Sequence, residues 1–265
     1  MSQDLRLALL IAGLCLIGAL LMYAAGVKRG TSVTVLHRGH FPNPGDAATA
    51  LFYYLFFCLL YLPVGVANAA ADTPAESGSG LSLEISNIAF TLVIYAPLLL
   101  RWALLPHSGR RRISLLNAAR LLGTGLAGVF AFIILYQLSG LYGFIVNLSG
   151  APAIQQVSSE VINAQGGAHL AALGVSTLLI APVCEEVFHR GFVFTTLLHR
   201  CGFVPAAVMS GLLFGALHFA LPQFLPLSFL GFTLAWVYYR SRSLWLPIVL
   251  HALFNAFNFG MLVLL

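Results

Sequence analysis

The sequence predicts an all-α fold, a polytopic membrane bundle of about eight transmembrane helices. Of its 265 residues, 60% are hydrophobic and only 8% are charged, and the mean hydropathy is +0.93. Ordinary soluble domains carry about 25% charged residues. Apolar runs recur along the chain, each long enough to cross a bilayer as a helix of about 20 residues. This composition excludes a soluble domain, and we expect membrane lipids, not nucleic acid, as the surroundings.

The first half of the chain predicts four spans. Lys28 and Arg29 follow the first span, so it is expected to remain as a helix, since a cleaved signal peptide carries its positive charge before a shorter apolar core. No pattern in this half indicates a specificity, and residues 1–148 form one region of four helices with unknown specificity. The predicted spans are about residues 5–27, 47–71, 85–105 and 119–148.

The second half predicts four more spans, a four-helix core over residues 168–265 that carries the candidate catalytic residues described below and belongs to the same integral membrane domain. The fifth span is long and contains Pro182, which is expected to kink it because proline lacks a backbone N–H. The predicted spans are about residues 169–199, 203–221, 222–239 and 244–265.

Charge at the ends of the spans alternates. Basic residues follow the first, third, fifth and seventh spans, with Arg110–Arg112 the strongest example, whereas acidic residues follow the second and fourth. Basic loops stay on the cytoplasmic side of a membrane. The pattern therefore predicts a multi-pass protein of the cell (inner or plasma) membrane, with both termini outside. The basic loops are expected to be cytoplasmic, and residues 72–84 and 151–165 external.

An ionisable cluster interrupts the fifth span. Glu185, Glu186, His189 and Arg190 lie within an otherwise apolar run. Carboxylates are costly inside a membrane and are therefore functional candidates. At helical pitch Glu186 can pair with Arg190, four residues on, whereas Glu185 has only His189 in that position. One glutamate is thus expected to be structural and the other free, unless all four residues form a buried cluster that only fixes packing.

The last helices carry further polar groups. His218 lies in the sixth span, and His251 and Asn255 share one face of the eighth. A carboxylate and an imidazole around one water make a general base, while imidazole and amide N–H groups stabilise an oxyanion. That inventory suits hydrolysis of a peptide bond. The competing chemistry is a divalent metal held by Glu185, His218, His251 and Asn255, although neither H-E-x-x-H nor a thiolate pair is present.

Three ordered motifs carry a family resemblance. Glu185-Glu186-x-x-x-Arg190, Phe214-x-x-x-His218 and His251-x-x-x-Asn255 resemble the motifs of the CAAX-protease and bacteriocin-processing (CPBP, or ABI) family of intramembrane endopeptidases. The resemblance covers roughly residues 174–259.

The resemblance implies a role for each motif position. Glu185 and His218 would activate a water, and His251 and Asn255 would form the oxyanion site. Glu186, Arg190 and Phe214 would support them. The resemblance implies that the protein is a hydrolase that needs no cofactor. The alternative is a metalloprotease that binds Zn²⁺ or another divalent metal. The substrate would be a hydrophobic or lipidated protein, cut near its C-terminus as in CAAX endopeptidases. A non-catalytic bacteriocin-immunity or peptide-binding module and a proton-coupled carrier are the other hypotheses.

Overall fold

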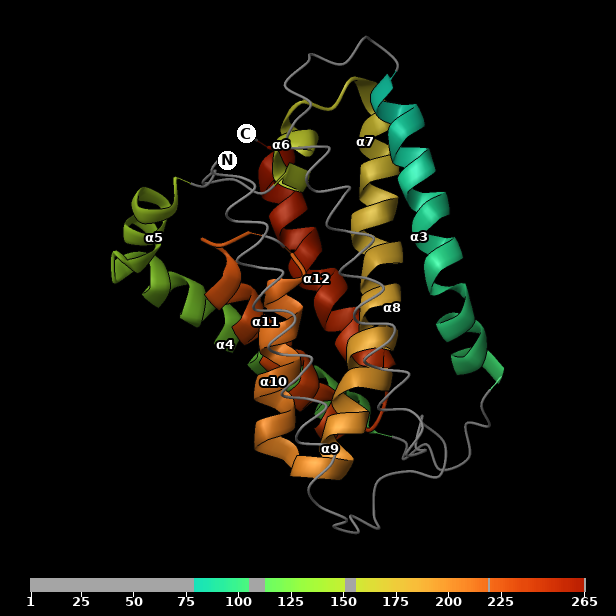
Figure 1. The fold of residues 1–265 in the computed structure, drawn as a ribbon, viewed down its shortest axis with the longest axis vertical. Helices are drawn as coiled ribbons and strands as arrows, with labels where there is room; N and C mark the ends of the chain where they lie inside the picture. Colours follow the sequence, from blue (N-terminus) through green and yellow to red (C-terminus); the bar gives the residue numbers. More distant parts are fainter. Residues whose placement is uncertain (1–78, 105–112, 151–155, 219, 265) are drawn as a thin grey trace.

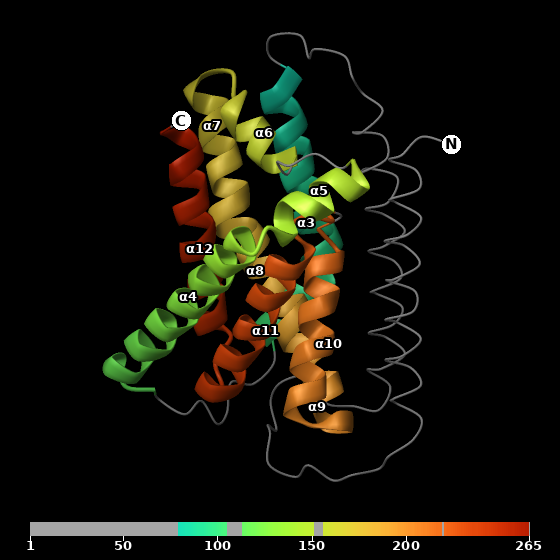
Figure 2. The same cartoon turned by 90° about the vertical axis from the view of Figure 1, so that its left-hand side faces the viewer.

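The computed structural model describes residues 79–104, 113–150, 156–218 and 220–264, and all regular structure among them is helical. Figures 1 and 2 show most of these helices running lengthwise in one bundle, with α4 crossing its side obliquely. The helices are α3 (Ser79–Leu104), α4 (Leu115–Leu138), α5 (Leu141–Ser149), α6 (Gln156–Ile162), α7 (Gly166–Val175), η1 (Ser176–Ile180), α8 (Ala181–Glu186), η2 (Val187–Phe194), α9 (Thr195–Cys201), α10 (Phe203–Ala216), α11 (Phe224–Ser241) and α12 (Trp245–Val263).

The all-α prediction is confirmed for these residues. Within them, three helices are long and apolar enough to cross a membrane, namely Leu115–Leu138, Gly166–Leu198 and Trp245–Val263. A helical membrane bundle therefore fits the chain. The first two predicted spans, residues 5–27 and 47–71, lie outside the described residues.

The predicted fourth span is wrong as one continuous helix. The structure divides residues 119–148 between α4 and α5, with the break at Ser139 and Gly140. Gly140 has a φ of +74°, in the left-handed region that ends helices and that glycine adopts without steric cost. The predicted external loops are also partly helical, because α3 begins at Ser79 and α6 occupies Gln156–Ile162.

The predicted fifth span is a continuous helical column with two π-helical turns. These turns, η1 and η2, flank the short helix α8, which carries Pro182 and both glutamates. η1 ends two residues before Pro182. The hydroxyl of Thr195, the first residue of α9, donates to the carbonyl of Arg190 in η2 at 2.7 Å. Single π-helical turns are frequent at functional sites.

Helices α10 and α11 pack closely because glycines line their contact. A Cβ on Gly231 would lie 2.8 Å from the Cα of Gly211 and 2.9 Å from the Cβ of Phe214. Small residues allow the backbones of membrane helices to approach each other in this way. The approach brings the backbone of Gly231 up to the side of α10 that carries Phe214.

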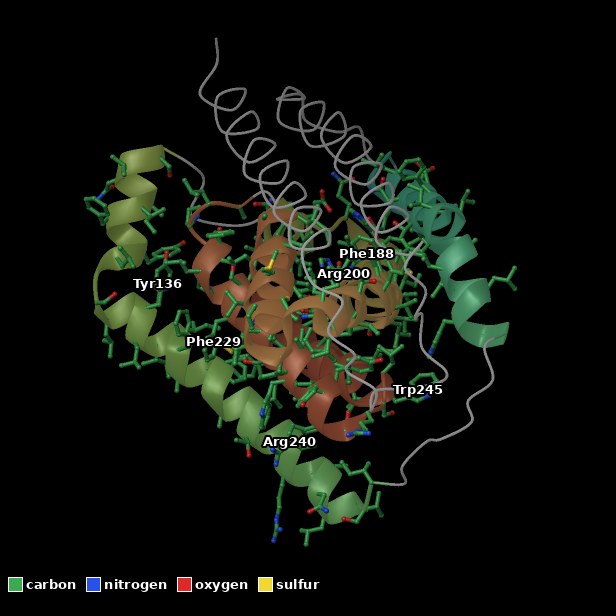
Figure 3. The ribbon with its side chains drawn as sticks, turned by 60° about the horizontal axis from the view of Figure 1, so that its bottom comes forward. Tyr136, Phe188, Arg200, Phe229, Arg240 and Trp245 are labelled. Carbon is green, nitrogen blue, oxygen red and sulfur yellow. The ribbon has the colours of Figure 1, made fainter. Side chains whose placement is uncertain are left out.

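Helix α4 docks on α11 through aromatic side chains. The rings of Phe132 and Phe229 stack with their centroids 4.4 Å apart, and the hydroxyl of Tyr136 donates to the carbonyl of Pro222 at 2.8 Å. Figure 3 labels Tyr136 and Phe229 at this contact. The opposite side of α4 exposes leucines such as Leu116 and Leu135, as expected for a helix that faces lipid.

Candidate active site

A buried ion-pair cluster joins α8, η2 and α12. The guanidinium of Arg190 donates to Glu186 Oε1 at 3.0 Å and to the carbonyl of Gly231 at 2.9 Å. His251 Nδ1 lies 3.1 Å from the same Glu186 oxygen. Glu186 and Arg190 have no exposed side-chain surface, and His251 has 3%. The contact expected between Glu186 and Arg190 is therefore present, with His251 as an additional partner.

We expect Arg190→Ala to destabilise the protein strongly. The change leaves the Glu186 carboxylate buried without its cation, and breaking such a pair costs roughly 3 to 5 kcal/mol. The measurement is thermal unfolding of the purified protein in detergent, together with its yield. Arg240→Ala, at an exposed arginine of α11, is the matched control and should stay within about 0.5 kcal/mol of wild type. Equal midpoints for Arg190→Ala and wild type would contradict a structural role for the cluster.

The second glutamate faces a different histidine. Glu185 Oε2 lies 4.0 Å from His218 Nε2, and the two side chains are 25% and 26% exposed. His218 does not lie within a helix as predicted, because α10 ends at Ala216 and His218 follows it. Its Nδ1 is 2.7 Å from the carbonyl of Phe214, a group that the end of the helix leaves free.

This contact fixes which nitrogen of His218 carries the proton. A carbonyl oxygen only accepts, so Nδ1–H donates to Phe214 and Nε2 of the neutral ring is an acceptor. With the ring neutral, a carboxylate oxygen and an acceptor nitrogen face each other across 4.0 Å, a separation too long for a direct hydrogen bond. A water molecule, which carries two O–H donors, has the chemistry to satisfy both.

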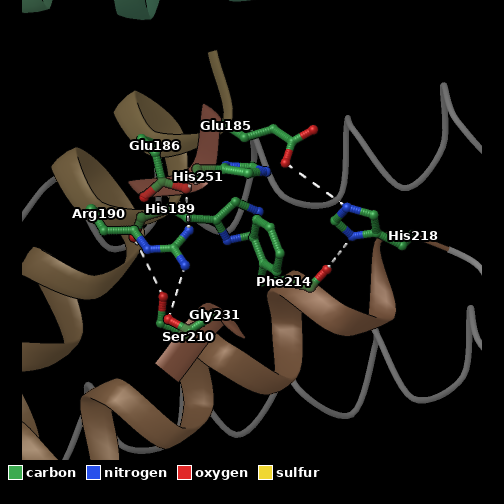
Figure 4. Close-up of polar contacts among 9 residues, drawn as sticks. All are labelled: Glu185, Glu186, His189, Arg190, Ser210, Phe214, His218, Gly231 and His251. Atoms are coloured by element: carbon green, nitrogen blue, oxygen red, sulfur yellow. Dashed lines mark hydrogen bonds and ion pairs between the residues drawn. The ribbon is translucent and has the colours of Figure 1, made fainter. Parts of the chain in front are cut away.

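The ring of Phe214 is the common neighbour of the polar groups. Its centroid lies 4.7 Å from that of His218 and 5.4 Å from that of His251. The Arg190 guanidinium carbon lies 4.8 Å from the same centroid, within the range of a cation–π contact. Figure 4 shows the buried cluster on one side of this ring and the Glu185–His218 pair on the other.

Asn255 is held by the long helical column. Its amide Nδ2 donates to the carbonyl of Thr177 in η1 at 2.9 Å. An amide nitrogen has two N–H groups, so this contact fixes the side chain and uses one of them. The imidazole of His251 has no second donor of this kind when it is neutral. Its Nδ1–H donates to Glu186, and Nε2 is then an acceptor. The two residues predicted to act together thus have separate partners.

The metal alternative depends on a set of ligands close to one another. Within the described ranges, no group of three or more His, Cys, Asp or Glu side chains is arranged to hold a metal ion. Glu185 faces His218, whereas His251 faces Glu186. The contact of His251 with Glu186 uses Nδ1 and leaves Nε2 as the atom that could bind a metal.

These features define a helical membrane protein with a buried ion-pair cluster beside a partly exposed glutamate–histidine pair. Residues 167–257 match the model of the family described as type II CAAX prenyl endopeptidase Rce1-like. The chain is also 33% identical over 79 residues to a Bacillus subtilis (strain 168) protein named "Putative membrane peptidase YdiL". That alignment covers 30% of this chain and 32% of the relative. No solved structure shows a significant match.

Both comparisons support the resemblance to the CAAX-protease family, since both matches are described as peptidases. The chain spans about a third of the length of its B. subtilis relative. The family match over residues 167–257 contains all three motifs. The family match begins at residue 167 and does not reach the N-terminal helices.

Proposed function

We propose that this protein is an intramembrane endopeptidase that hydrolyses a peptide bond near the C-terminus of a lipidated or membrane-bound protein. The observation that supports this most directly is the Glu185–His218 pair, with two acceptor atoms 4.0 Å apart and a quarter of each side chain exposed. Glu186, one residue away, is fully buried and paired. Only Glu185 is therefore placed to meet a substrate.

The proposed reaction uses the chain's own residues. A water held between Glu185 and His218 loses a proton to the Glu185 carboxylate as its oxygen bonds to the carbonyl carbon of the scissile peptide. The carbonyl oxygen becomes an oxyanion, which the second N–H of Asn255 stabilises. His251 can add a donor there only when both its ring nitrogens are protonated. Glu185 then returns its proton to the leaving amine as the C–N bond breaks.

Cleavage assays in membranes test this function. Wild-type and Glu185→Gln protein would be expressed in matched cells, and the termini of their membrane proteins compared by mass spectrometry. We expect uncleaved membrane or lipidated proteins to accumulate only with Glu185→Gln. Purified protein in liposomes should then cut the corresponding peptides. Identical termini in the two cell lines would favour the non-catalytic immunity or peptide-binding module.

We also propose eight spans with both termini outside and the basic loops in the cytoplasm. The arrangement of the helix ends supports this orientation. The end of α3, the start of α4 and the ends of α9 and α11, which adjoin basic residues, lie at one end of the bundle in Figures 1 and 2. The start of α3 and the loop between α6 and α7 lie at the other.

Labelling of single cysteines tests this topology. A membrane-impermeant thiol reagent added to intact cells should modify Asn163→Cys, between α6 and α7, and should not modify Arg240→Cys, near the end of α11. Both positions are exposed in the structure, so burial does not explain a difference. Permeabilised cells should give modification at both positions and serve as the control. External modification at position 240 but not at position 163 would reverse the orientation.

A further inference from the structure

The segment that carries His218 is held at both of its ends. It connects α10 with α11. At its start, the backbone N–H and the Nδ1–H of His218 donate to carbonyls at the end of α10. Near its other end, the carbonyl of Pro222 accepts from the hydroxyl of Tyr136, a buried residue of α4, at 2.8 Å. The segment is therefore tied to two different helices.

The carbonyl of Pro222 needs a side-chain donor for a reason that lies in the sequence. The carbonyl of Gln223, the next residue, accepts from the N–H four residues on, as in an α-helix. For Pro222 that donor would belong to Pro226, which has no N–H. A buried carbonyl without a donor costs free energy. The hydroxyl of Tyr136 takes the place of the missing N–H.

Aromatic neighbours hold the ring of Tyr136. Its centroid lies 6.4 Å from that of Phe132, which stacks on Phe229 of α11, and 6.0 Å from that of Tyr142 in α5. A phenylalanine at position 136 would keep these ring contacts. The hydroxyl is thus the part of Tyr136 that packing does not require, and its role is the bond to Pro222.

We propose that Tyr136 is a positioning residue that holds His218 in place through the carbonyl of Pro222. This inference rests on the proposed function, in which His218 and Glu185 hold the reacting water across 4.0 Å. Since Pro222 is only four residues from His218, a displacement at Pro222 should move the imidazole. A misplacement of about 1 Å can cost on the order of 100-fold in rate. Tyr136 lies outside residues 167–257, so α4 would add a contact that the three motifs do not contain.

Tyr136→Phe tests the proposal, because it removes the hydroxyl and keeps the ring. The probe is a synthetic peptide with a farnesylated C-terminal CAAX sequence. We expect kcat to fall about tenfold and KM to stay within about twofold of wild type, because His218 acts on the water and not on substrate binding. Pro226→Ala supplies an N–H four residues after Pro222, where helical geometry directs it to that carbonyl. The double variant Tyr136→Phe/Pro226→Ala should therefore recover most of the lost kcat.

Thr233→Val is the matched control. The hydroxyl of Thr233 also donates to a backbone carbonyl, that of Phe229 at 2.9 Å, and its side chain lies where α11 meets α4, outside the His218 segment. Its kcat should equal that of wild type. An unchanged kcat in Tyr136→Phe, or a loss that Pro226→Ala does not restore, would overturn the inference and leave the peptidase intact.

Backbone hydrogen–deuterium exchange separates this inference from the proposed function. The amides of residues 217–224 should exchange faster in Tyr136→Phe than in wild type or Thr233→Val, whether or not the peptide is cut. Wild-type protein that shows this difference without cutting the peptide would overturn the function and keep Tyr136 as the anchor of the His218 segment. Unchanged exchange in a protein that cuts the peptide would overturn the inference alone, and unchanged exchange without cleavage would overturn both.

Discussion

Replacing Glu185 by glutamine is expected to abolish peptide hydrolysis while the protein still folds. The amide keeps the size and most hydrogen-bonding capacity of the carboxylate but cannot take a proton from water. Loss of a general base lowers kcat by roughly 10²- to 10⁴-fold. Because Glu185 is a quarter exposed and Oε2 faces His218 without a direct hydrogen bond, its loss leaves no buried charge unpaired. Turnover of a peptide substrate and the unfolding midpoint are the two measurements.

Two other glutamates supply the controls for this variant. Glu186→Gln makes the same chemical change one residue away, and there the unfolding midpoint should fall because Arg190 and His251 lose their common anion. Glu84→Gln alters a buried glutamate of α3, outside the site, and should leave kcat unchanged. A Glu185→Gln protein with wild-type turnover would remove Glu185 from the reaction.

The features of the site that follow from one helical turn were predictable from the sequence. Glu186 and Arg190 are four residues apart, and helical geometry places such residues side by side wherever the helix lies. The structure has this contact at 3.0 Å, with both residues buried. The same spacing singled out Glu185 as the glutamate without an arginine, and the structure gives it His218 as neighbour.

Contacts that depend on packing between distant segments were not predictable. His251 and Glu186 are 65 residues apart, and their contact follows from how α12 packs against α8. Nothing in the spacing of the His251-x-x-x-Asn255 motif indicates that the histidine turns to a glutamate and the asparagine to the carbonyl of Thr177. The carbonyl of Thr177 is open to Asn255 because of the π-helical register of η1. There the N–H of Ala181 donates to Ser176, and the next residue, Pro182, has no N–H.

The ends of helices were the least predictable part of the fold. Hydropathy continues through Gly140 and through His218, so both predicted spans were too long. In the structure Gly140 separates two helices through its positive φ, and the imidazole of His218 caps a carbonyl just beyond α10. The second difference matters for function, because it places His218 in a turn where Nε2 can face Glu185.

Asn255→Ala is expected to lower kcat by roughly 10²- to 10³-fold, the loss typical of one oxyanion donor, with little change in substrate affinity. The contact with Thr177 explains why this residue suits the role. It holds the amide in place with one N–H and leaves the second for the developing charge, so little reorganisation is needed during the reaction. Asn258→Ala is the matched control, since Asn258 lies one turn further along α12 and donates to the carbonyl of Phe254.

Asn255→Asp separates this mechanism from the metal-dependent alternative. If Asn255 donates to an oxyanion, aspartate places a negative charge against the developing one. It also turns a carboxylate oxygen toward the carbonyl of Thr177, where a donor is needed. The variant should then be at least as inactive as Asn255→Ala, and wild-type activity should survive removal of metal by chelators.

If Asn255 is instead a ligand, the outcome reverses. A divalent cation should copurify near one per chain, chelators should abolish activity, and aspartate should preserve or tighten metal binding, because a carboxylate suits Zn²⁺ at least as well as an amide. His251 could join such a site through Nε2 while its Nδ1–H still donates to Glu186, since a ligating histidine commonly donates its other ring N–H to a carboxylate. Full, chelator-sensitive activity in Asn255→Asp would therefore overturn the oxyanion role of Asn255.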